Sequence, residues 1–293
     1  MNHKSPGYPR VARIAQVTVA LLAGAIAVLP IRAAPQDRPE AYASPYTVKF
    51  SHPLAELLGD IEHGERGRAE DESSVPFSEW SSPHIRKHYG SWGPPARHYP
   101  ASSSAATRPV ERQRERVIAV ALRFLGYGYQ HHHIPDWNPP NGWPWKETSV
   151  GHNGKGLDCS NFTAFVYNLA LGLKPSGNVK DQSAQLEISG PGTDRVSRAV
   201  RIELPSSYAD RVKLLRTGDL LFIRNTKGEI SHVVLWVGEI GRSPDNSPLL
   251  IDSHGEGVHD CRGKAIPCGI YLRPFLEKSW YCRSASHAIR VLK

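Results

Sequence analysis

Two stretches of the chain carry apolar residues at helical spacing. In the first, over residues 109–126, apolar side chains recur at positions 117, 121, 124 and 125, which places them on one stripe of a helix. Pro109 suits the first turn of this helix, and Gly126 suits its end. The second stretch covers residues 158–172, with Asp158 as the expected N-cap. Its buried face is expected to hold Phe162, Phe165, Val166, Leu169 and Ala170.

Short and almost continuously apolar runs follow in the second half of the chain. Turn sequences such as TGD, NTKGE and RSPDNSP separate them, and this punctuation favours strands over helices. The predicted strands cover residues 220–223, 231–238, 248–253, 269–275 and 286–292. Helices that precede a group of strands indicate an α+β fold, in which the strands form an antiparallel meander.

The N-terminal residues have the pattern of a targeting segment. Arg10 and Arg13 precede an apolar run over residues 15–29, and small residues follow that run, as in a secretory signal peptide. The run is too short for a comfortable transmembrane helix. We therefore predict a signal peptide over residues 1–33, cleaved near Ala33. The mature chain is then exported, periplasmic or secreted, with no stable membrane insertion after cleavage.

Residues 34–108 are dense in Pro, Ser, Gly and charged side chains, a composition typical of linkers. One short helix is expected at residues 53–61. We interpret the stretch as a poorly structured or docking segment that ends in a linker. The folded domain is then expected to span residues 109–293.

The net charge does not point to a particular class of partner. The chain holds 36 Lys and Arg against 28 Asp and Glu, a net charge of +8. Residues 1–33 contain four of the basic residues and no acidic one, which leaves 32 basic against 28 acidic side chains. So small an excess gives no reason to expect a nucleic-acid partner. A hydrophobic fraction of 40% excludes a fully disordered chain.

The four cysteines are too few for a scaffold built on disulfides. Three of them lie near the C-terminus, at positions 261, 268 and 282, and Cys159 stands alone. Export permits disulfides, and a bridge between Cys261 and Cys268 is the most plausible pairing. The spacing does not match a compact zinc ribbon, so no metal is expected there.

Cys159 and His232 are the candidates for chemistry. Cys159 falls in the first turn of the second predicted helix, where free N–H groups and the helix dipole favour the nucleophilic thiolate. His232 lies within an otherwise apolar strand, where an imidazole is costly to bury without a partner. A third polar group should orient it, and the next strand offers Asp252 and His254, which point to the same side. Both stay open for this role. Taken singly, Cys159 also fits an inert buried thiol and His232 a core histidine.

The segments GLDCSNFTAFVY, LRTGDLLFI, ISHVVLWVG and LLIDSHG occur in this order. The ordered set resembles the NlpC family of papain-like cell-wall cysteine peptidases, over about residues 109–293. The resemblance implies a papain-like α+β core and an exported endopeptidase. Such an enzyme cleaves amide bonds in peptidoglycan stem peptides through a thioester, without a cofactor.

Carried over residue by residue, the resemblance implies Cys159 as nucleophile and His232 as general base. Asp252 or His254 is the third member, because this chain has Asp252 where the family usually shows a histidine. LGYGYQ resembles a family segment that would place Tyr129 beside the cysteine. Tyr129 and the backbone N–H of Cys159 would then meet the oxyanion. Asp158 and Ser160 flank the nucleophile and are the other candidates for binding substrate.

The stretch from residue 130 to 156 is bulkier than the family's usual connection at this point. It contains three adjacent histidines, 131–133, which alternate sides on a strand and so favour a polar loop over a metal site. Its tryptophans, 137, 143 and 145, are expected to act as lid or packing residues. Two other functions stay open, namely amide or acyl transfer on the same fold and a non-catalytic cell-wall-binding protein. The oligomeric state is left open.

Overall fold

The computed structural model describes residues 42–62, 105, 107–126, 128–129, 157–190 and 196–293. The predicted signal peptide and the insert over residues 130–156, with its three histidines and three tryptophans, lie outside these described residues. Among the described residues, no helix has the length and apolar character needed to cross a membrane.

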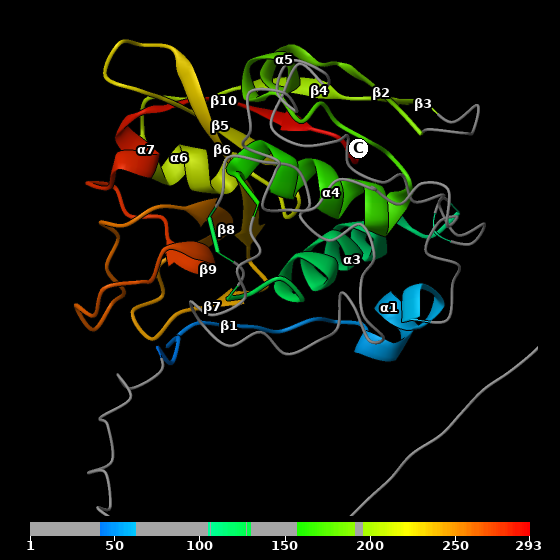
Figure 1. Cartoon of the computed structure of the whole chain (residues 1–293), viewed down its shortest axis with the longest axis horizontal. Helices are drawn as coiled ribbons and strands as arrows, with labels where there is room; N and C mark the ends of the chain where they lie inside the picture. The colour runs from blue at the N-terminus through cyan, green and yellow to red at the C-terminus, as the bar shows by residue number, and fades with distance from the viewer. Residues whose placement is uncertain (1–41, 63–104, 106, 127, 130–156, 191–195) are drawn as a thin grey trace, which may run out of the picture. The chain divides into compact units, whose positions relative to one another are not determined.

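A six-stranded antiparallel sheet carries the fold (Figure 1). Its spatial order is β4-β10-β5-β6-β8-β9. The strands are β4 (Val200–Glu203), β5 (Leu220–Arg224), β6 (Ile230–Gly238), β8 (Leu249–His254), β9 (Gly269–Pro274) and β10 (Ala285–Arg290). The run β5-β6-β8-β9 is the predicted meander. The last strand does not continue this meander. Strand β10 does not pair with β9 but lies between β4 and β5, toward the opposite edge of the sheet.

Two helices cover one face of this sheet. They are α3 (Val110–Leu122) and α4 (Cys159–Leu171), close to the predicted bounds. Helix α4 packs on β6 and β8, and α3 packs on α4 (Figure 1). The C-cap Gly172 of α4 has a φ of 68°, a left-handed conformation that glycine adopts without strain.

The other face of the sheet is covered as well. Helices α6 (Tyr208–Leu214) and α7 (Trp280–Arg283) lie near it, and a second apolar cluster fills the space. Along β5, Leu220 and Phe222 belong to the cluster under α3 and α4, whereas Leu221 and Ile223 belong to the second one. This alternation is the period of two along a strand. Burial on both faces explains why the strands read as continuous apolar runs.

Helix α3 buries two arginines together with its apolar stripe. Arg116 donates from Nε to the carbonyl of Ala170 at 2.6 Å, and its Nη1 lies 2.6 Å from Asp60 Oδ1. Arg114 donates to the carbonyl of Thr217 at 2.9 Å. The Arg116 guanidinium is therefore satisfied, whereas the buried Nε of Arg114 has no hydrogen-bond partner among the described residues.

Part of the stretch interpreted as a poorly structured or docking segment packs on the domain. Strand β1 (Thr47–Val48) pairs with β7 (Gly241–Arg242), and helix α1 (Leu54–Glu62) packs against α3. The side chain of Tyr46 is buried, and its hydroxyl accepts a hydrogen bond from the backbone N–H of Cys261 at 2.8 Å. Residues 42–62 therefore pack against β7, α3 and Cys261.

Several short elements were not expected from the sequence. They are α5 (Val179–Ala184), β2 (Glu187–Ser189), β3 (Val196–Arg198), β4, α6, β7 and α7. The prediction of a disulfide bridge between Cys261 and Cys268 is wrong, because all four cysteines are free in the structure. Cys268 is exposed and Cys261 is part-buried against the main apolar cluster.

Candidate active site

The N-terminus of α4 positions the sulfur of Cys159. Asp158 is the N-cap, and its carboxylate accepts from the backbone N–H of Asn161 at 2.8 Å and from the Asn161 amide at 2.9 Å. The hydroxyl of Ser160 donates to the carbonyl of Gly177 at 2.7 Å. Asp158 and Ser160 thus fix the turn around the cysteine. Cys159, as the first helical residue, has a backbone N–H without an intrahelical partner.

His232 on β6 joins the cysteine to a carboxylate. Its Nε2 donates to Asp252 Oδ2 on the neighbouring strand β8 at 2.7 Å. The ring also interacts electrostatically with Cys159, whose negative charge acts to raise the pKa of the imidazole. Because Nε2 is taken by Asp252, Nδ1 is the ring nitrogen left to serve Cys159. The structure therefore brings Cys159, His232 and Asp252 into one chain of contacts, and all three side chains are buried.

Asp252 is held as an anion by two further donors. Arg273 on β9 donates from Nε to Asp252 Oδ1 at 2.7 Å, and the hydroxyl of Tyr281 donates to Oδ2 at 2.9 Å. Burial alone would raise the pKa of this carboxyl, but the Arg273 charge and the His232 contact outweigh it and lower the pKa to about 2. The carboxylate therefore stays charged at neutral pH.

The pKa of the His232 imidazole is shifted in the opposite direction to that of Asp252. Burial favours the neutral ring and works to lower the pKa of His232. The negative charge on Cys159 and the hydrogen bond to Asp252 outweigh burial and raise the pKa to about 10. The imidazole of His232 therefore favours its protonated form in this site.

His254, the other candidate for the third position, does not contact His232 through a hydrogen bond. The two rings are nearly perpendicular, with centroids 5.1 Å apart. His254 donates from Nδ1 to the carbonyl of Gly255 at 3.0 Å. Burial lowers its pKa, which favours a neutral ring. Of the two alternatives left open by the sequence, the structure places Asp252 on the imidazole.

Tyr129 lies in the electrostatic neighbourhood of the cysteine, as the resemblance implied. Burial raises its pKa first, and the negative charges on Cys159 and Asp158 raise it further. The phenol is therefore neutral and can donate a hydrogen bond.

A cavity of about 400 Å³ is lined by His254, Trp280 and Tyr281, each of which has a ring contact with His232. Trp280 forms part of its wall, and the Trp280 ring lies 5.5 Å from that of His232 and 5.6 Å from that of His254. The other lining residues include Glu256, Val258, Pro274 and Leu276. The walls are mostly apolar, and one of them, Trp280, packs against the His232 ring.

Two residues of the site were not found from the sequence. Arg273 is a charged residue inside an apolar strand, GIYLRPF, which is the same signal that singled out His232. Tyr281 belongs to the four-residue helix α7 and carries no local pattern that could have found it.

Comparison with known proteins gives one decisive match. A family model described as the NlpC/P60 family matches residues 146–262. This region is an NlpC/P60 region. It contains Cys159, His232 and Asp252, and it spans less than half of the chain. The resemblance to the NlpC family is therefore confirmed, and so is the α+β papain-like fold that it implied.

Solved structures of the NlpC/P60 family are similar to the chain, with low scores. A family protein from Bacillus cereus shares 19% identity and a TM-score of 0.34, over 64% of this chain and 41% of that one. NlpC1 from Trichomonas vaginalis shares 15% identity and a TM-score of 0.34, over 61% and 44%. The NlpC/p60 domain of the peptidoglycan hydrolase SagA has 17% sequence identity to this chain and a TM-score of 0.31. The match covers 59% of this chain and 94% of that one.

The chain thus spans less than half the length of the first two structures. Likenesses of this strength do not bear on activity, so the family assignment rests on the sequence match. No curated protein matches the chain.

Proposed function

We propose that the chain is an exported cysteine hydrolase that cleaves amide bonds in the stem peptides of peptidoglycan. The observation that carries the proposal is the contact chain from Cys159 through His232 to Asp252, inside the NlpC/P60 region. A buried thiol that serves only packing needs neither an imidazole partner nor a buried carboxylate behind it. The arrangement costs desolvation of three ionisable groups, which favours a functional role.

The proposed reaction runs through a thioester. The Cys159 thiolate attacks the carbonyl carbon of the scissile amide, and the oxyanion accepts from the backbone N–H of Cys159 and from Tyr129. His232, as imidazolium, gives its Nδ1 proton to the leaving amine when the C–N bond breaks. The neutral ring then takes a proton from water as the water attacks the thioester, and the acid is released with the thiolate restored.

Asp252 acts in this scheme by orienting the ring. The carboxylate holds His232 Nε2–H at 2.7 Å and so directs Nδ1 toward the sulfur and the leaving nitrogen. Arg273 and Tyr281 keep the carboxylate charged and immobile, since each donates to one of its oxygens. They are positioning residues, because they act through Asp252.

The cavity beside His254 fits the leaving-group side of the substrate. The imidazole protonates the leaving amine, so the residue that carries this amine must lie next to His232. The cavity is lined by His254 and Trp280, whose rings contact that of His232. We assign it to the first residue after the cleaved bond.

The substrate class and the location follow from the family and the N-terminal sequence. The match to the NlpC/P60 family over residues 146–262 supports a cell-wall peptide as substrate. The N-terminal pattern of two arginines, an apolar run and small residues predicts export, which delivers the enzyme to the cell wall.

The test is digestion of purified muropeptides by the full chain and by Cys159→Ala, with products identified by mass. Cys261→Ala, a thiol remote from α4 in sequence, is the matched control. We expect hydrolysed products from the native chain and the control, and none from Cys159→Ala. Undiminished turnover by Cys159→Ala would overturn the proposal. Products that carry an added amine in place of water would identify a transferase instead.

A further inference from the structure

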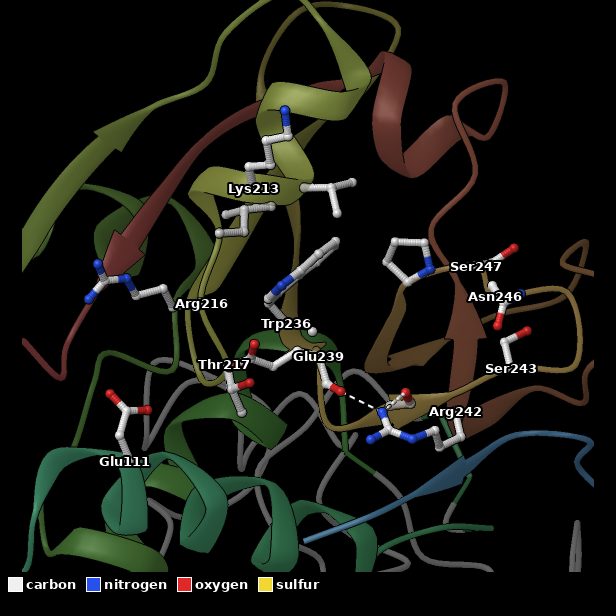
Figure 2. A pocket seen from close by; sticks show the side chains of 15 residues that line it. Glu111, Lys213, Arg216, Thr217, Trp236, Glu239, Arg242, Ser243, Asn246 and Ser247 are labelled. Carbon is white, nitrogen blue, oxygen red and sulfur yellow. Dashed lines mark hydrogen bonds between the residues drawn. The ribbon is translucent and has the colours of Figure 1, made fainter. Parts of the chain in front are cut away.

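A second cavity, of about 720 Å³, opens at the far end of β6 from His232. Its walls come from α6, from the turn before β5, from the end of β6 and from the loop over residues 243–248 (Figure 2). We call it the Trp236 pocket, after the residue at its base. Trp236 follows His232 by four positions, so both side chains project to the same face about 13 Å apart.

Trp236 presents one unsatisfied hydrogen-bond donor to this pocket. Its side chain is only 1% exposed, and its indole packs edge-on against Phe275, with centroids 5.0 Å apart. None of the hydrogen bonds formed by the described residues uses its Nε1–H, although the residue lines the pocket. Nε1 is not among the buried polar atoms that lack a partner, so this donor is open to the pocket, where a ligand oxygen can accept from it.

Gly238 keeps that donor open. It adopts a φ of 66°, and a Cβ built on it would lie 2.8 Å from the Trp236 Nε1 and 3.2 Å from the Thr217 hydroxyl. Only glycine fits both the left-handed backbone and the space beside the indole nitrogen. The sequence at this turn therefore leaves room for a small acceptor group against the N–H.

The charged residues of the pocket do not form an ion cradle. Figure 2 shows the ammonium of Lys213 and the guanidinium of Arg216 pointing away from Trp236. The guanidinium of Arg242 is occupied by the backbone carbonyls of Glu239 and Gly241, the latter at 2.7 Å. These three cations do not converge on one point, so the pocket does not suit an anionic ligand.

Neutral polar groups line the side opposite the indole. Asn246 and Ser247 stand across from Trp236 in Figure 2. Asn246 is exposed and has a φ of 58°, and its side-chain amide is free to donate and to accept. Together with Trp236 Nε1–H, this set matches a neutral molecule that carries both a carbonyl and hydroxyl groups.

We infer that the Trp236 pocket binds the glycan of peptidoglycan, with the carbonyl of an N-acyl amino sugar on Trp236 Nε1 and its hydroxyls on Asn246. The inference rests on the proposed function, because it takes the stem peptide at Cys159 as the anchor of the same substrate. The separation of about 13 Å along β6 is within reach of a sugar joined to that peptide.

The test measures binding without catalysis. The probe is a β-1,4-linked tetramer of N-acetylglucosamine, which has no peptide bond between residues to cleave, titrated calorimetrically into the full chain. Trp236→Phe removes the N–H and keeps the aromatic packing, and Asn246→Gly removes the amide without straining the left-handed backbone. Tyr42→Phe, which removes a hydroxyl that donates to Asp260 outside the pocket, is the matched control. Circular dichroism checks the fold of each variant.

We expect binding by the native chain and by Tyr42→Phe. Trp236→Phe and Asn246→Gly should each weaken it by about three- to tenfold, the scale of one hydrogen bond. The deacetylated glucosamine tetramer, which lacks the carbonyl, should bind at least as weakly. No binding of the acetylated tetramer, or equal binding by both variants, would overturn the inference. If Cys159→Ala binds the tetramer yet still turns over muropeptides, the proposed function fails while the glycan site stands.

Discussion

The substitution Asp252→Asn separates the orienting role of this carboxylate from its contribution to stability. Asparagine keeps the size and an acceptor oxygen, but it removes the charge that faces His232 and Arg273. The native pKa of about 2, against an ordinary value of 3.8, corresponds to roughly 2.5 kcal/mol of favourable interaction of the charged form. We expect a loss of unfolding free energy of this order, measured by urea denaturation.

The pH dependence of that loss has a definite sign. A carboxyl with a lowered native pKa contributes stability that is complete above its unfolded value and disappears as the pH falls toward the native one. The difference in unfolding free energy between the native chain and Asp252→Asn should therefore be largest between about pH 4 and about pH 6, below the pH range in which His232 adds its own dependence. It should shrink between about pH 4 and pH 2.

Asp219→Asn is the matched control for activity. Asp219 is a buried carboxylate paired with Arg290 at 3.0 and 2.7 Å, as Asp252 is paired with Arg273. Both variants should lose stability, but only Asp252→Asn should lose turnover, by about 10³-fold or more, the scale seen when a triad carboxylate becomes an amide. Equal turnover by the two folded variants would refute the role assigned to Asp252.

Three further outcomes follow from the same geometry. Tyr281→Phe removes one of three donors to Asp252, so it should lower turnover by about tenfold and unfolding free energy by about 1–2 kcal/mol; no change in turnover would exclude a positioning role. Cys159→Ala should move the titration of His232, followed by NMR, from about 10 to a lower pH; an unmoved titration would mean that the sulfur does not face the ring. Trp280→Ala should raise KM for substrates with a bulky residue after the cleaved bond more than for those with glycine there; equal effects would remove the leaving-group assignment.

Local sequence information was sufficient for the elements that carry Cys159 and His232. The N-cap Asp158 and the apolar spacing of α4 lie within one short segment, so both are readable without tertiary context. The edge strand β4 and the helix α6 were not predicted, because neither contains a fully buried residue and so neither shows a hydrophobic periodicity in the sequence. Their place depends on partners far along the chain.

The choice between Asp252 and His254 could not be made from the sequence because strand register decides it. The pairing of Leu235 with Ile251 and of Trp236 with Leu250, if continued, would set His254 directly across from His232. The structure instead has Asp252 reaching the imidazole. Arg273 from β9 and Tyr281 from α7 hold the carboxylate there. Neither residue is adjacent in sequence to the strands that it organises.

The docking of residues 42–62 has the same origin. Tyr46 and the helix α1 are ordinary in composition, and their burial depends on Cys261 and on α3, which lie elsewhere in the chain. A local pattern could indicate a short helix at this point, but it could not indicate the surface that the helix covers.

The most direct measurement is a search for an acyl group on the sulfur of Cys159 during turnover. The full chain is mixed with a stem peptide, quenched with acid within milliseconds to seconds, digested and analysed by mass spectrometry. The account predicts a peptide containing Cys159 that carries the acyl half of the substrate, formed with the first product and removed by hydroxylamine. Turnover with no acyl group on Cys159 at any quench time, or with the group on another residue, would contradict it.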